Sequence, residues 1–162
     1  SIYSLFIFCC ILIFFSNSFL IKVLIISLVC FSYLNSKNRT FLGDSGSLLL
    51  AFIISYFFIK LYNLNYIKFS DEIVLYMLIP GLDLIRLFIS RILKKKNPLS
   101  SDRHHLHHLL LFNYSLKKTL VIILFLISFP IVLNYLNINN LYTILISIFN
   151  YTALITFLYT RD

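Results

Sequence analysis

The chain has 162 residues, of which 60% are hydrophobic and only 12% are charged. Because about a quarter of the residues in a soluble domain are usually charged, this composition excludes an ordinary soluble fold and indicates a protein of the lipid bilayer. The net charge of +8 comes mainly from basic residues that flank apolar segments, a pattern that favours contact with anionic lipid or an anionic substrate over nucleic acid.

Six apolar segments follow one another along the chain, and polar breaks rich in Asn or carrying Pro or Gly separate them. A spanning helix needs roughly 20 apolar residues, so the pattern predicts an all-α, polytopic membrane bundle of about six transmembrane helices. Residues 1–162 contain no linker and are predicted to form a single transmembrane domain. The six segments are Ile2–Phe15, Phe19–Leu34, Ser47–Leu61, Ile73–Leu93, Leu116–Leu133 and Leu141–Tyr159.

The first segment is short, and no charged region precedes it as it would in a signal peptide. We therefore expect the chain to begin partway through a longer protein. If the six segments alternate in direction, ten of the fourteen Lys and Arg residues fall on one side of the membrane. They lie in Asn35–Gly46, in or next to Lys94–Ser115, and at the C-terminus. Because basic loops stay on the cytoplasmic side, these regions are predicted to be cytoplasmic.

The fourth segment carries Pro80-Gly81, which predicts a broken helix, either a span with a polar seam or a half-span followed by an interfacial helix. After the break, a polar stripe recurs at spacings of three and four and consists of Asp83, Arg86, Ser90 and Lys94. An ionisable residue inside a span suggests a functional site. Arg86 is the expected partner of Asp83, and a purely structural ion pair is an equal alternative.

The first motif that could carry chemistry is Phe41–Ser47, which reads FLGDSGS and lies just before the third segment. Gly43 and Gly46 allow tight backbone geometry. A carboxylate such as that of Asp44, placed where a helix begins, can hold Mg²⁺ bridged to phosphate oxygens. The alternative is an ordinary helix cap, since Asp and Ser are common at that position.

The second motif, Asn97–His108, holds all four histidines of the protein and follows Lys94–Lys96. Clustered imidazoles and a guanidinium can bind a phosphate or diphosphate through charge-assisted hydrogen bonds. Imidazole also binds transition metals, although the basic surroundings would repel a divalent cation. A solvated interfacial loop without a ligand is the third interpretation.

Taken together, these motifs resemble those of the polyprenyl-phosphate N-acetylhexosamine-1-phosphate transferases, a superfamily that also includes the muramoyl-pentapeptide transferases. Their order and spacing match about the last half of a family member. The resemblance lies in Asn35 with Phe41-Leu42-Gly43-Asp44-Ser45-Gly46-Ser47, in Pro80-Gly81-Leu82-Asp83 with Arg91, and in Asn97-Pro98-Leu99-Ser100-Ser101-Asp102-Arg103-His104-His105-Leu106-His107-His108.

The resemblance implies a reaction at the cytoplasmic face of the bacterial inner membrane, with Mg²⁺ as cofactor. A UDP-amino sugar would donate its sugar-1-phosphate to undecaprenyl phosphate, giving a lipid-linked diphosphate sugar and UMP. By motif match, Asp44 would bind the metal, and His105, His107 and His108 would act with it as catalytic residues on the donor diphosphate. The substrate-binding residues implied in the same way are Arg103, Gly43, Ser45, Gly46, Ser47 and Asp83.

Two motifs of the family, DDxxD and NxxNxxDG, do not occur in the sequence. We therefore expect that the 162-residue chain alone lacks a complete active site. The alternatives are a membrane fragment or subunit without activity of its own, and a histidine-rich metal-binding membrane protein. The sequence identifies neither the sugar nor the oligomeric state, and a homodimer is compatible with it.

Overall fold

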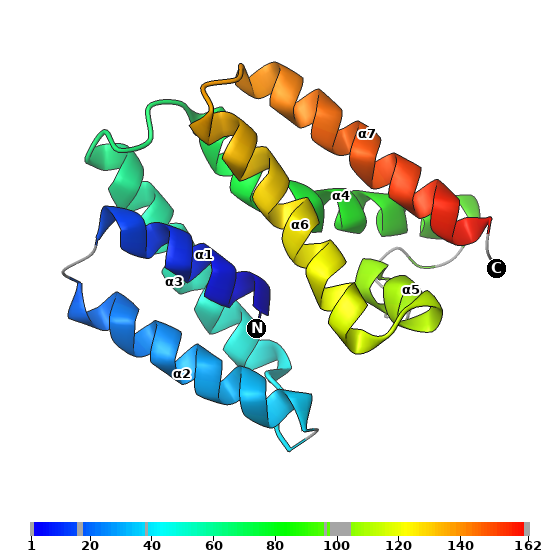
Figure 1. Ribbon diagram of the computed structural model, residues 1–162, viewed down its shortest axis with the longest axis horizontal. Coiled ribbons are helices and arrows are strands. Elements are labelled where there is room, and N and C mark those ends of the chain that lie inside the picture. Colours follow the sequence, from blue (N-terminus) through cyan, green and yellow to red (C-terminus); the bar gives the residue numbers. More distant parts are fainter. Residues whose placement is uncertain (1, 16–17, 38, 96, 98–104, 161–162) are drawn as a thin grey trace. The chain divides into compact units, whose positions relative to one another are not determined.

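The computed structural model describes residues 2–15, 18–37, 39–95, 97 and 105–160, and every regular element among them is an α-helix. The all-α prediction is confirmed (Figure 1). The helices are α1 (Ile2–Phe14), α2 (Phe19–Ser36), α3 (Gly43–Asn63), α4 (Ser70–Leu93), α5 (Leu106–Asn113), α6 (Leu116–Tyr135) and α7 (Asn140–Tyr159).

Five of these helices, α2, α3, α4, α6 and α7, are long and apolar enough to cross a membrane. Large apolar side chains point outward from them, including Phe52, which is 72% exposed, and Phe149, which is 71% exposed. An apolar surface of this extent suits lipid better than water. The chain is therefore a multi-pass helical membrane protein. The first predicted span corresponds to α1, whose 13 residues make it shorter than the other five.

The chain divides into two compact units, Ser1–Ser70 and Asp71–Asp162. In the first unit α1 packs against α2 and α3, and the Phe8 and Phe57 rings meet edge to face with their centroids 6.4 Å apart. In the second unit α6 packs against α7, and the short α5 contacts both (Figure 1). The single transmembrane domain stays a prediction.

Helix α4 runs without interruption from Ser70 to Leu93 and contains Pro80. The expected break at Pro80-Gly81 is therefore wrong, because both residues lie inside one continuous helix. Proline removes one backbone donor, but a helix surrounded by lipid has no other way to satisfy its remaining backbone groups, so it continues past the proline. The polar stripe of Asp83 and Arg86 consequently lies on the same helix as the apolar residues before it.

Two helix boundaries that matter for function differ from the sequence prediction. Helix α3 begins at Gly43, so the GDSGS motif forms the first turn of the helix and does not precede it. Helix α5 was not predicted at all, because it lies inside the polar segment Lys94–Ser115, and it begins directly after His105. The GDSGS motif and the last histidines of the second motif, His107 and His108, therefore lie in the first turns of helices.

Candidate functional site

A buried carboxylate, that of Asp83, is the centre of a polar cluster in the second unit. Asp83 is only 9% exposed. It accepts hydrogen bonds from the Arg86 guanidinium at 2.8 Å, from the Tyr151 hydroxyl at 3.0 Å and from Nδ1 of His105 at 3.0 Å. The backbone N–H of Leu106 donates to both carboxylate oxygens, at 3.2 and 3.3 Å. The predicted Asp83–Arg86 pair is confirmed.

The cluster joins three helices of this unit. Asp83 and Arg86 lie one turn apart on α4, and the Tyr151 hydroxyl on α7 accepts a further hydrogen bond from Nε of Arg86 at 3.1 Å. Arg86 also donates from Nη1 to the Tyr159 hydroxyl, again at 3.1 Å. Because Tyr151 is itself buried, the ion pair is shielded from solvent, as a charge inside a span requires.

Asp83 also determines how α5 begins. The residue that precedes the first turn of α5 is His105, and its side chain makes no capping hydrogen bond. The Asp83 carboxylate performs that role from another helix by accepting the Leu106 N–H. A negative charge at this end of a helix is stabilised by the unpaired N–H groups and by the helix dipole. The start of the histidine-bearing helix is therefore fixed by α4.

Three of the predicted site histidines lie together at the start of α5. The rings of His105 and His107 stack with their centroids 5.8 Å apart, and those of His107 and His108 are 4.2 Å apart. Loss of hydration lowers the pKa of His107, and the neighbouring His108 and His105 lower it further, while Asp83 acts in the opposite direction. Arg103, the fourth predicted residue of this motif, lies outside the described residues.

The GDSGS motif forms the first turn of α3 in the first unit. Asp44 is exposed and is the second helical residue, while Leu42 occupies the N-cap position, so a capping role does not account for Asp44. Gly43 has a φ of +64°, a conformation that glycine adopts readily. The Ser47 hydroxyl donates to the backbone carbonyls of Gly43 and Asp44 at 3.1 and 2.9 Å.

The other two predicted residues of this turn differ in exposure, since Ser45 is exposed and Gly46 is partly covered. A Cβ atom at Gly46 would lie 2.9 Å from the end of the Leu42 side chain. Among the described residues no group of three His, Cys, Asp or Glu side chains is placed to hold a metal ion. A single exposed carboxylate such as that of Asp44 still fits Mg²⁺, which usually takes one or two carboxylates together with water and substrate phosphates.

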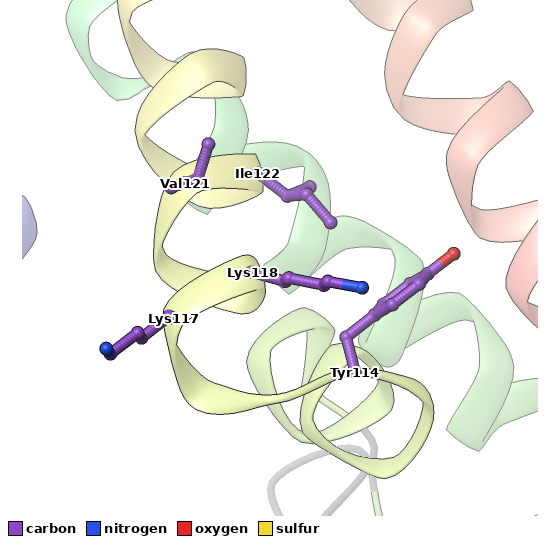
Figure 2. Close-up of a pocket in the computed structure, with 5 residues that line it drawn as sticks. All are labelled: Tyr114, Lys117, Lys118, Val121 and Ile122. Carbon is purple, nitrogen blue, oxygen red and sulfur yellow. The ribbon is translucent and has the colours of Figure 1, made fainter.

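A groove with one basic end lies along α6 in the second unit. Its first part is a cavity of about 420 Å³ lined by Tyr114, Lys117, Lys118, Val121 and Ile122. Figure 2 shows the Lys118 side chain extending toward the Tyr114 ring, whereas Lys117 points to the opposite side of the helix. A second cavity of about 380 Å³ is also lined by Val121 and Ile122, and it continues along α6 to α7.

Sequence reasoning missed Tyr151 and Tyr159 as members of the cluster. The chain contains 11 tyrosines, and no local pattern separates these two from the others. Their partner Arg86 lies 65 and 73 positions earlier in the chain. Only the hydrogen bonds between side chains of α4 and α7 reveal that they hold the charged pair.

Comparison with known proteins yields relatives that carry one name, undecaprenyl-phosphate alpha-N-acetylglucosaminyl 1-phosphate transferase. The chain is 30% identical to that of Thermotoga maritima over 105 residues, which is 63% of this chain and 33% of the relative. It is 30% identical to that of Yersinia pestis and 29% to that of Escherichia coli K12, each over 79 residues, which is 48% of this chain and 22% of each relative.

The aligned segments thus cover a third or less of each relative's length. No family model matches the chain, and no solved structure matches it. The similarity is consistent with the transferase family that the sequence motifs resemble, as a partial match.

Proposed function

We propose that this chain is part of a membrane phosphotransferase that moves N-acetylhexosamine-1-phosphate from a UDP-sugar to undecaprenyl phosphate. An oxygen of the acceptor phosphate attacks the phosphorus that bears the sugar. The bond from that phosphorus to the bridging oxygen of the donor breaks, and UMP leaves. The observation that carries the proposal is the gathering of His105, His107 and His108 at the start of α5, in a chain whose relatives are named as such transferases.

The chemistry of this reaction suits the residues present. Transfer of a phosphoryl group depends mostly on positioning and on neutralising charge. Imidazolium groups can donate to the oxygens of the donor diphosphate through charge-assisted hydrogen bonds. We assign this role to the three histidines, together with Arg103, and we expect the polar turn Gly43–Ser47 to contribute to substrate binding.

Mg²⁺ is the cofactor that this proposal includes, and Asp44 is the residue that would hold it. When bound, the metal supplies neutralisation of the phosphate charge. The exposed position of Asp44 in the first turn of α3 leaves its carboxylate accessible to a hydrated ion. The sequence order of the spans supports a role in the same reaction, because alternating crossings put the segment before α3 and the segment that contains α5 on one side of the membrane. The charge bias supports the cytoplasmic side for these segments, and the bacterial sources of the relatives support a bacterial inner membrane.

The groove along α6 supports a lipid acceptor. A phosphate headgroup would find the amine of Lys118 at the basic end, and an isoprenoid chain would lie against the aliphatic wall of Val121 and Ile122. The groove lies close to the histidines, since the eight residues of α5 extend over only about 12 Å.

The test is transfer in bacterial membranes that contain the chain together with the N-terminal part of the Thermotoga maritima relative. Given UDP-N-acetylglucosamine, undecaprenyl phosphate and Mg²⁺, these membranes should form the lipid-linked diphosphate sugar and release equimolar UMP. His105→Ala and His107→Ala should abolish product formation. Asp71→Asn should not, because Asp71 lies at the opposite end of α4 and accepts from Asn140.

Two outcomes would overturn the proposal. One is that product forms at an undiminished rate when His105 and His107 are both replaced. The other is that the histidine cluster binds Zn²⁺ in a titration while the chain has no affinity for the UDP-sugar, which would favour a metal-binding membrane protein.

A further inference from the structure

The carboxylate of Asp83 has little capacity left for a ligand. A carboxylate offers about four acceptor sites, and here it receives hydrogen bonds from Arg86, Tyr151, His105 and the Leu106 backbone. The side chain is also buried. A substrate or metal could reach it only by displacing one of these donors. The contact with substrate that the sequence suggested for Asp83 is therefore hard to reconcile with its surroundings.

The same hydrogen bonds define the state of His105. An ionised carboxylate only accepts hydrogen bonds, so the ring nitrogen that faces it, Nδ1, must carry the proton. This leaves Nε2 as the ring nitrogen of His105 that can meet a ligand. The N–H of the next residue, Leu106, is held by the same carboxylate, so the orientation of the ring and the start of α5 are set together.

We propose that Asp83 is a positioning residue that acts through His105 and the start of α5 and does not touch the substrate. Arg86 and Tyr151 donate hydrogen bonds to the Asp83 carboxylate and so fix its position. Because Tyr151 also accepts from Arg86, this hydrogen-bond network reaches from α4 to α7. The proposal rests on the proposed function in one respect only, namely that the positioned histidines bind the donor diphosphate. The geometry of the cluster itself does not depend on the reaction.

The first test reads the proton position of His105 directly. The full chain, labelled with ¹⁵N in the histidine rings, is placed in lipid nanodiscs, and the His105 signals are identified by their loss in His105→Gln. In the wild type at a pH where the ring is neutral, Nδ1 should be the protonated nitrogen. Asp83→Asn, which removes the charge with little change in size, should move the proton to Nε2. Asp71→Asn is the matched control on the same helix and should leave the signals unchanged.

The second test covers the helix start and allows for a variant that fails to fold. Tyr151→Phe removes one donor to Asp83 but keeps the ring, and Tyr142→Phe is its control on the exposed face of α7. Hydrogen exchange at the first amides of α5 should be faster in Asp83→Asn and, to a lesser degree, in Tyr151→Phe. Exchange elsewhere in α4 and α7 should stay slow, which separates loss of positioning from unfolding.

A binding measurement connects the geometry to the ligand. Inorganic pyrophosphate, used as the probe, should bind Asp83→Asn at least about tenfold more weakly than the wild type, because a charge-assisted hydrogen bond to a badly oriented ring is lost. If neither the wild type nor Asp83→Asn binds pyrophosphate but the His105 proton moves from Nδ1 to Nε2 as expected, the proposed function fails and the positioning role stands. If His105 keeps its proton on Nδ1 and α5 exchanges normally in Asp83→Asn, the positioning role is wrong.

Discussion

The three histidines at the start of α5 have different surroundings, and we therefore expect them to have different tasks. His105 is bound to Asp83 through Nδ1, whereas His107 and His108 are more exposed than His105, although His107 is still partly shielded from water. The pKa of His107 is held below its ordinary value by lost hydration and by the two neighbouring imidazoles. His107 is therefore mostly neutral near pH 7 before a ligand arrives, and it can take up a proton when an anion binds.

This leads to a prediction about pH. A bound diphosphate favours the charged imidazole and raises the pKa of His107, so affinity should increase as the pH falls below 7 and decrease as the pH rises. The groups that face His107 are His105, His108 and Asp83, of which the first two oppose its protonation and the third favours it. Calorimetry of UDP binding in buffers of different ionisation enthalpy should detect proton uptake at pH 7.

The control for this prediction is His107→Gln, which keeps a polar side chain that cannot be charged. It should bind UDP more weakly and with a flatter pH profile between about pH 6 and 8, the range in which histidine normally titrates. An unchanged profile would show that another group takes up the proton.

At Asp44 the prediction concerns the metal. Asp44→Asn in the reconstituted transferase should reduce Mg²⁺-dependent turnover by at least about a hundredfold, because an amide is a far weaker ligand for Mg²⁺ than a carboxylate. The thermal unfolding of the protein in detergent should be unchanged, since Asp44 is exposed. Turnover close to the wild-type rate would remove Asp44 from the site.

At the scale of a single helix, the first turn of α3 contains two glycines with different requirements. Gly43 has a positive φ, whereas Gly46 is an ordinary helical residue whose added Cβ would meet the side chain of Leu42, with its Cδ1 at 2.9 Å and its Cγ at 3.1 Å. Gly43→Ala should therefore destabilise the protein by about 1 kcal/mol or more. Gly46→Ala should be close to neutral, because alanine favours a helix and offsets the tighter contact.

Thermal unfolding of the two variants in the same detergent checks this difference. Gly43→Ala should also lower turnover in the reconstituted transferase, because Asp44 directly follows the altered residue. Equal unfolding temperatures for the two variants would mean that the positive φ of Gly43 is not needed.

The helices show how far sequence patterns reach. Long apolar runs located the spans to within a few residues, because a helix that crosses a bilayer needs about 20 consecutive apolar residues. Helix α5 was missed, since its eight residues are too few for a clear period and four histidines nearby suggested a loop. The role of Tyr151 was beyond prediction, because its hydrogen bond to Asp83 joins residues 68 positions apart.

At the scale of the whole molecule, the distribution of charge predicts the orientation of the chain in the membrane. The basic residues gather on one set of loops, and the segment between α3 and α4 carries Lys68 close to Asp71 and Glu72. The positive-inside rule then predicts that the segment between α2 and α3 is cytoplasmic and that the segment between α3 and α4 lies outside.

Cysteine labelling in intact cells tests this orientation. With the native cysteines replaced by serine, Tyr66→Cys should react with a membrane-impermeant thiol reagent, whereas Lys37→Cys should react only after the membrane is permeabilised. Both positions are exposed. The reverse pattern would put the histidines on the outer face, away from any cytoplasmic UDP-sugar.

The cluster around Asp83 has a consequence for synthesis of the protein. Tyr151 leaves the ribosome 68 residues after Asp83, which at about 5–20 residues per second is a delay of roughly 3 to 14 s. During that interval α4 enters the bilayer with a charge whose final hydroxyl partner does not yet exist. Arg86 is its first partner, and His105 follows 22 residues after Asp83. A chain that ended before α7 would keep this exposed pair, a feature by which membrane quality control could recognise incomplete copies.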